Sequence, residues 1–156
     1  MIYVFDSSTL IRLFRNFYLS RFPSLWEKFD QAVKVESITS VREVCNEIEQ
    51  HDDRLSAWAK SHRDFFQKPS EDEKAFVAEI FRVAHFQSMV RNQQRLEGKP
   101  PVADPFVIAR ARVLKGCVVT EEVNTPNAAR IPNVCGHFGI AWLSLEGFME
   151  EENWTF

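Results

Sequence analysis

Residues 2–9 read IYVFDSST, an apolar run that ends at an acid and continues in small polar residues. The first four residues have the β-branched and aromatic composition of a buried strand, and residues 6–9 are good helix-capping types. The stretch therefore predicts a strand that runs directly into a helix ending near Phe17. Its acid, Asp6, falls at the carboxyl end of the strand, the edge at which open parallel sheets bind ligands.

The rest of the chain alternates between helical and strand patterns. Further helices are expected over residues 22–33, 40–49, 55–62, 69–84 and 104–115, with a short one at the C-terminus. Further strands are expected near residues 35–38, 117–120 and 140–143, and the stretch from residue 125 is irregular or helical. This alternation predicts a single α/β domain, residues 1–156, around a mostly parallel sheet.

Composition excludes several classes of protein. The chain has 156 residues, of which 45% are hydrophobic, and its fourteen Phe and four Trp argue against disorder. No apolar run approaches the roughly 20 residues that span a bilayer, and the N-terminus lacks the basic region of a signal peptide. Three cysteines without CxxC spacing argue against a disulfide framework or a zinc site and favour the reducing cytoplasm.

The net charge of −3 hides a basic segment. Residues 82–115 hold seven lysines and arginines against two acids, a net charge of +5, so the other residues carry −8. Within it, residues 87–101 are predicted to form a basic arm or loop that holds Arg91, Arg95 and Lys99. The segment is either a nucleic-acid contact or a solvated helix face.

Acids occur at several predicted strand and helix ends. Asp6 and the pair Glu121-Glu122 follow strands, and Asp104 precedes a proline at the start of a helix. The alternative is that Asp6 and Asp104 are only N-caps, each contributing about 1 kcal/mol.

A further acid comes from the helix over residues 40–49. Ser40 and Glu43 fit a capping box, which would give Glu43 a local role. Glu47 flanks the apolar stripe of this helix without such a role, and it is therefore the better site candidate.

Several carboxylates at one edge of a sheet repel one another unless a cation lies between them. Oxygen-only ligands favour Mg²⁺ or Mn²⁺ over zinc. These ions activate water and support the cleavage of phosphate esters.

At these residues the chain resembles PIN-domain nucleases. Four stretches resemble the motifs of that family in the expected order, namely residues 2–11, 40–48, 102–109 and 118–122. Residues 131–140 resemble the C-terminal stretch of a bacterial PIN branch still named as a domain of unknown function.

The resemblance implies a three-layer α/β/α sandwich and a metal-dependent endonuclease. The implied role is an endoribonuclease toxin of a VapBC-like toxin–antitoxin pair, with a small antitoxin protein as partner. The site residues that it implies, for catalysis and for Mg²⁺ or Mn²⁺, are Asp6, Glu47, Asp104 and Glu122.

The resemblance leaves several details open. Ser7 and Ser8, with the amides that open the first helix, are candidates for phosphate contact, although Ser8 stands where many relatives have Asn. Glu121 competes with Glu122 for the fourth acid position. Whether one ion or two bind, and whether the protein forms a homodimer, also stay open.

Two other classes of protein do not fit the residues that follow the first predicted strand. A receiver-like phosphoacceptor needs two acids after the first strand, and a haloacid-dehalogenase-type phosphatase needs DxD where this chain has Asp6-Ser7-Ser8. Two alternatives stay open: a DNA-cutting or nicking PIN nuclease, and a catalytically silent module of the same fold that binds nucleic acid or protein.

Overall fold

The computed structural model describes residues 1–51, 53–89 and 102–156. Within them, five strands form one parallel sheet in the order β3-β2-β1-β4-β5. The strands are β1 (Tyr3–Phe5), β2 (Ile38–Val41), β3 (Phe66–Gln67), β4 (Cys117–Val119) and β5 (Ala141–Leu143). A parallel sheet requires a crossover between successive strands, which the helical patterns of the sequence supply.

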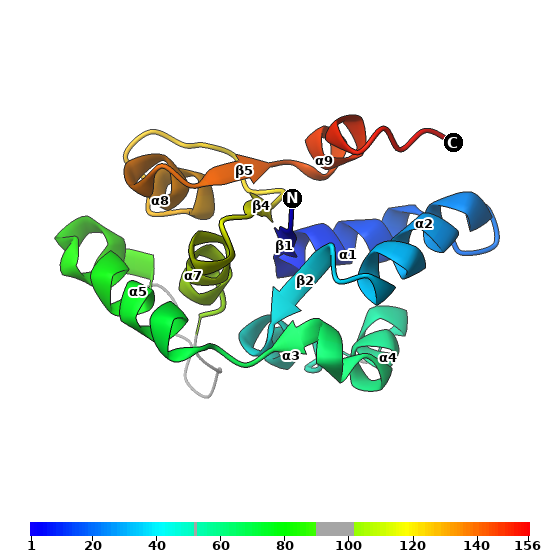
Figure 1. The fold of residues 1–156 in the computed structure, drawn as a ribbon, viewed down its shortest axis with the longest axis horizontal. Helices are drawn as coiled ribbons and strands as arrows, with labels where there is room; N and C mark the ends of the chain where they lie inside the picture. The colour runs from blue at the N-terminus through cyan, green and yellow to red at the C-terminus, as the bar shows by residue number, and fades with distance from the viewer. Residues whose placement is uncertain (52, 90–101) are drawn as a thin grey trace.

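Helices cover both faces of this sheet. They are α1 (Ser7–Asn16), α2 (Pro23–Lys34), α3 (Arg42–Ile48), α4 (Arg54–Ser61), α5 (Glu71–Arg82), α7 (Asp104–Leu114), α8 (Ile131–Phe138) and α9 (Leu145–Glu151), with 3₁₀ turns η1 (Arg63–Phe65) and η2 (Ala84–Gln87). Helices α5, α7 and α8 lie on one side of β1 and β2, and α1 and α2 on the other (Figure 1). The predicted three-layer α/β/α fold is therefore confirmed.

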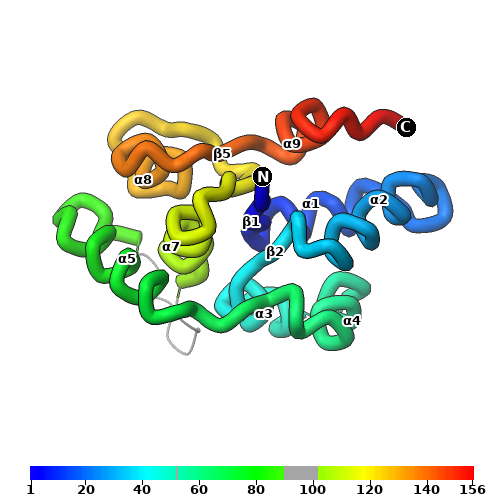
Figure 2. Tube along the Cα trace, in the orientation of Figure 1, coloured from blue at the N-terminus to red at the C-terminus, as the bar shows by residue number. Residues whose placement is uncertain are grey.

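The central strand β1 is buried on both faces because β2 and β4 flank it and helices cover it. Phe5 packs edge-on against Phe148 of α9, with ring centroids 5.2 Å apart. On the other side of the core, Phe14 packs edge-on against Trp26, so the abundant aromatic residues join the helices to the sheet. Figure 2 shows the chain passing through α1 and α2 before it returns to the sheet as β2.

Two other expectations from composition can be compared with the structure. The three cysteines are free and buried. Each helix in the described part of the chain is too short or too polar to cross a bilayer.

The region around β2 differs from the sequence prediction. The strand occupies Ile38–Val41 instead of residues 35–38, and α3 begins at Arg42 with Val41 as its N-cap. Ser40 is therefore a strand residue, and its hydroxyl donates to the Phe5 carbonyl oxygen (2.6 Å) instead of capping the helix. The predicted capping box of Ser40 and Glu43 is wrong.

Two smaller differences concern β3 and Asp104. The two-residue strand β3 was not predicted, because so short a run carries no periodic signal. Asp104 is the first residue of α7, and the N-cap is Ala103 without a side-chain hydrogen bond. The N-cap alternative for Asp104 is therefore wrong, whereas Asp6 does cap α1 by accepting from the Thr9 amide.

Candidate functional site

Four carboxylates gather at the carboxyl edge of the sheet and are called the acid cluster below: Asp6, Glu47, Asp104 and Glu122. Asp6 follows β1, and Glu122 lies three residues beyond the end of the neighbouring strand β4. Glu47 comes from α3 and Asp104 from the first turn of α7. Mutual repulsion affects the pKa values of these groups, so the structure brings the four predicted acids together.

Asp6 is the most enclosed of the four, with 2% of its surface exposed. Its Oδ1 accepts from the Thr9 amide (2.9 Å), and its Oδ2 accepts from the Thr120 hydroxyl (2.6 Å). Burial raises the pKa of Asp6 above its ordinary value of 3.8, and hydrogen bonds from Thr120, Thr9 and Ser8 oppose the rise. These donors stabilise the ionised form in a position that water barely reaches.

Glu47 is held at the start of α7. Its Oε1 accepts from the Ala103 amide (3.2 Å), and Ser7 contributes a side-chain hydrogen bond. Burial raises the pKa of Glu47, and repulsion from Asp6 and Glu122 adds to the rise. The Glu47 side chain therefore joins α3 to the backbone directly before Asp104, beside the other acids.

Asp104 and Glu122 share a hydrogen bond between their side chains. Burial, followed by repulsion from Glu122, raises the pKa of Asp104 well above 3.8. Burial also raises the pKa of Glu122, while the Ile131 amide, which donates to Glu122 Oε2 (2.8 Å), opposes that rise. Because a bond between two carboxyl groups requires a proton, the pair holds one between them when no cation is present.

The neighbouring acid Glu121 turns away from this cluster. Its Oε2 accepts from Arg12 Nη1 (2.5 Å), and its Oε1 accepts from the Leu145 amide at the start of α9 (2.8 Å). Glu122 instead accepts from the Ile131 amide at the start of α8, so the two adjacent acids turn to different helices. Glu121 therefore joins α1 to α9.

Glu43 is also outside the cluster, although it is buried with 3% of its surface exposed. Its Oε1 pairs with Arg42 Nη2 (3.1 Å), and its Oε2 has no hydrogen-bond partner among the described residues. Glu47, and not Glu43, is thus the α3 acid that faces Asp6 and Glu122.

The sequence did not assign a role to Thr120. This residue is fully buried directly after β4, where threonine also fits as an ordinary strand-forming residue. Only its contact with Asp6, 114 positions away in the chain, distinguishes it. Ser8 also bonds to Asp6, so its hydroxyl is already engaged.

The remaining predicted site residues are distributed as follows. Arg91, Arg95 and Lys99 lie outside the described residues. All four histidines are exposed, namely His51, His62, His85 and His137.

The donor chemistry of the acid cluster fits a divalent cation. In the described ranges, no three His, Cys, Asp or Glu side chains already converge as an ion site, since the acids are turned towards protein donors. However, the cluster offers only carboxylate oxygens, the ligands that Mg²⁺ and Mn²⁺ prefer. A cation would also take the place of the proton between Asp104 and Glu122 and remove the repulsion that raises their pKa values.

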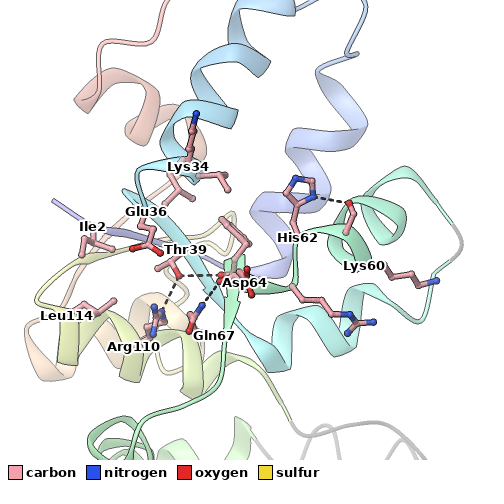
Figure 3. A pocket seen from close by; sticks show the side chains of 15 residues that line it. Ile2, Lys34, Glu36, Thr39, Lys60, His62, Asp64, Gln67, Arg110 and Leu114 are labelled. Atoms are coloured by element: carbon pink, nitrogen blue, oxygen red, sulfur yellow. Dashed lines mark hydrogen bonds between the residues drawn. The ribbon is translucent and has the colours of Figure 1, made fainter.

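A separate cavity of about 680 Å³ lies at the amino ends of β1 and β2, where Ile2 and Ile38 contribute to its lining (Figure 3). No member of the acid cluster lines it. Arg110, a cation of the basic segment, points into this cavity and donates to Thr39 Oγ1 (3.3 Å) and Glu73 Oε1 (3.4 Å). Arg110 is therefore held at the edge opposite the acids.

Comparisons with known proteins identify the fold. A family model described as a domain of unknown function, DUF4411, matches residues 3–156. The structure of VapBC2 from Rickettsia felis, bound to a DNA fragment from its promoter, gives a TM-score of 0.50 at 10% identity, covering 92% of this chain and 98% of that chain. The structure of FitAB bound to the IR36 DNA fragment gives 0.51 at 10% identity, covering 92% and 94%. At this identity the likeness concerns the fold alone. No curated protein matches the sequence.

Proposed function

The chain belongs to the DUF4411 family and has a PIN-like fold, and from this premise we propose that it is a metal-dependent nuclease. The observation that carries the proposal is the acid cluster, in which four carboxylates from separate elements lie close enough to raise one another's pKa values at the ligand-binding edge of a parallel sheet. Such an arrangement costs stability, and groups with strongly shifted pKa values are typical of functional sites.

We assign the four acids to the binding of Mg²⁺ or Mn²⁺. When bound, the ion supplies activation of water and offsets the negative charge that develops on the phosphate. Asp6 and Asp104 would hold it directly, because Asp6 is buried at the end of β1 and the other three acids all raise the pKa of Asp104. Glu47 would hold the ion or its water, and Glu122, which the Ile131 amide of α8 positions, would complete the set.

The first turn of α1 is the proposed contact for the scissile phosphate. The hydroxyls of Ser7 and Ser8 are engaged by Glu47 and Asp6, so they position the acids. The backbone amides of the same two residues lie at the N-terminus of a ten-residue helix, where an anion is favoured.

We further propose that the substrate is RNA and that the protein is the toxin of a toxin–antitoxin pair. The two structural neighbours are VapBC2 and FitAB, each bound to DNA, which supports contact of such assemblies with nucleic acid. An antitoxin would need an exposed apolar surface on this protein to cover. In the structure, Tyr18 is 63% exposed and the adjacent Leu19 is 57% exposed, between α1 and α2, which gives a partner a surface to cover.

Incubation of the purified protein with labelled RNA and DNA panels tests this function directly. We expect cleavage of single-stranded RNA in Mg²⁺ or Mn²⁺ and none in excess chelator. Preferential cleavage of DNA would support the DNA-cutting alternative. Binding of nucleic acid without any cleavage would support the catalytically silent module.

Expression in the native host, with and without the gene for a small neighbouring protein, tests the toxin role. Growth inhibition that the neighbour relieves, together with co-purification of the two proteins, is the expected result. An active nuclease that leaves growth unchanged would contradict a toxin.

A further inference from the structure

Two hydroxyl groups hold the Asp6 carboxylate. The Ser8 hydroxyl lies 2.9 Å from Oδ1 and 2.8 Å from Oδ2, almost equally far from both oxygens. The Thr120 hydroxyl donates to Oδ2 alone, at 2.6 Å. The Ser8 hydroxyl therefore bridges the two oxygens of Asp6, whereas the Thr120 hydroxyl binds only one of them.

The hydrogens of both hydroxyls are directed to Asp6 by the backbone that follows β4. The Glu121 amide donates to Ser8 Oγ (3.1 Å), and the Glu122 amide donates to Thr120 Oγ1 (3.1 Å). A hydroxyl has one hydrogen and two acceptor lone pairs. Because each oxygen already accepts from an amide, its single hydrogen is free to point to the carboxylate.

The position of the Ser8 hydrogen has a consequence for metal binding. A donor almost equally far from both carboxylate oxygens lies near the line that bisects the carboxylate, between its two oxygens. A cation bound by both oxygens of Asp6 would need this same position. Thr9 and Thr120 occupy one further lone pair on each oxygen. An ion can therefore bind Asp6 only when the single Ser8 hydrogen turns to one oxygen and releases a lone pair on the other, so one oxygen at a time is open to it.

We infer that Ser8 determines ion selectivity at the acid cluster by limiting Asp6 to one bond through one oxygen. The inference rests on the proposed function and assigns Ser8 as a positioning residue. Mg²⁺ requires near-octahedral geometry with a single bond from each carboxylate, and Mn²⁺ suits similar oxygen sites. Ca²⁺ takes six to eight oxygens and gains from carboxylates bound through both atoms. A Ser8 hydroxyl in the bridging position therefore favours Mg²⁺ and Mn²⁺ over Ca²⁺.

Thr120 provides a matched control. Valine has nearly the same shape as threonine but lacks the hydroxyl. Thr120→Val therefore removes the donor to Asp6 Oδ2 and leaves the Ser8 hydroxyl between the two oxygens. Ser8→Ala opens the bridging position and leaves Thr120 in place. Ser8→Gly is the second variant that opens this position, and Ser8→Thr retains the hydroxyl.

The test is calorimetric titration of each protein, without nucleic acid, with Mg²⁺, Mn²⁺ and Ca²⁺ separately. We expect Ser8→Ala and Ser8→Gly to lower the ratio of Mg²⁺ to Ca²⁺ affinity on the order of tenfold, the lower end of the effects seen when groups that orient metal ligands are lost. Thr120→Val should weaken all three ions without changing this ratio, and Ser8→Thr should restore it. The increase in melting temperature that each ion causes should rank the three ions in the same order as their affinities. This measurement does not depend on activity.

Three results would overturn the inference. An unchanged ratio in both Ser8→Ala and Ser8→Gly would show that the bridging hydroxyl does not select the ion. An equal change of the ratio in Thr120→Val would show that loss of any donor to Asp6 is sufficient. Absence of binding of every ion by the wild type would instead remove the proposed function, and the inference with it.

Discussion

The side chains of Asp104 and Glu122 share a hydrogen bond, and this contact joins the start of α7 to the segment after β4. Two acids in contact can share a proton, but they cannot both be ionised there without strong repulsion. The contact is thus stable when a proton or a cation lies between the two groups. It is the part of the acid cluster most sensitive to charge.

Replacing Asp104 with Asn should therefore separate stability from activity. Without metal near pH 7.5, Asp104→Asn should raise the melting temperature by about 2–4 °C, which corresponds to ~1 kcal/mol in a domain of this size. The same variant should lose nuclease activity, because a proposed ligand of the ion is gone. Thermal unfolding by circular dichroism and a cleavage assay measure the two effects. A melting temperature below that of the wild type would contradict the repulsion.

The stability of the metal-free protein should depend on pH with a definite sign. Burial raises the pKa values of Asp6, Glu47, Asp104 and Glu122 above their ordinary 3.8 and 4.5. The folded state then holds protons that the unfolded state has already released, so unfolding becomes easier as pH rises above these ordinary values and through the raised ones. The melting temperature in chelator should be higher at pH 5.5 than at pH 8, and Mg²⁺ should recover the difference at pH 8. A flat or opposite profile would count against coupled acids.

The two acids of α3 should behave differently. Glu47→Gln removes charge from the acid cluster and should reduce the cleavage rate by about two orders of magnitude, since metal assistance supplies several kcal/mol. Glu43→Gln alters a group outside the cluster and should retain activity, with a melting temperature within about 3 °C of the wild type. Steady-state kinetics and thermal unfolding of both variants check this. An inactive Glu43→Gln beside an active Glu47→Gln would reverse the assignment.

Glu121 and Glu122 offer a comparison of neighbours. Glu121→Gln retains an acceptor oxygen for the Leu145 amide, and Glu122→Gln retains one for the Ile131 amide. Glu121→Gln should lose only its ion pair with the half-exposed Arg12, roughly 0.5 kcal/mol, and remain active. Glu122→Gln should lose most activity and gain stability without metal. Equal activity of the two variants would remove Glu122 from the site.

The sequence predicted the parts of the site that depend on local pattern. Asp6 could be found because an acid directly after a buried strand, and before a helix, places its side chain at one edge of the sheet. The fold could be predicted because the alternation of strand and helix patterns is also visible in the local sequence. Ser40 was misplaced because a serine three residues before an acid fits a capping box equally well when it lies in a strand.

What could not be predicted depends on contacts between distant residues. Thr120 meets Asp6 across 114 positions, and no local signal marks that contact. Adjacent acids such as Glu121 and Glu122 have the same local context, and only the packing of α8 and α9 separates them. Strand β3 is defined by its pairing with β2 and not by its own two residues.

The basic arm, residues 87–101, stays a prediction from the sequence, with its cations beyond the described residues. Changing Arg91, Arg95 and Lys99 together to Gln should weaken RNA binding and flatten its salt dependence by up to about three counterions. Turnover at saturating substrate should change much less. The control with the same charge change is Lys28, Lys34 and Lys60 to Gln, three exposed lysines in α2 and α4. A salt slope unchanged in the arm variant would show that the arm does not contact the substrate.

The most direct test of the nuclease assignment is the cleavage rate of the wild type during a metal titration. Protein freed of metal by chelator is mixed with labelled single-stranded RNA, and Mg²⁺ is added back stepwise, with Asp104→Asn run in parallel. The account predicts no cleavage in chelator, a saturable recovery with Mg²⁺ in the wild type, and no recovery in Asp104→Asn. Full cleavage in excess chelator, or equal rates for the two proteins, would contradict it.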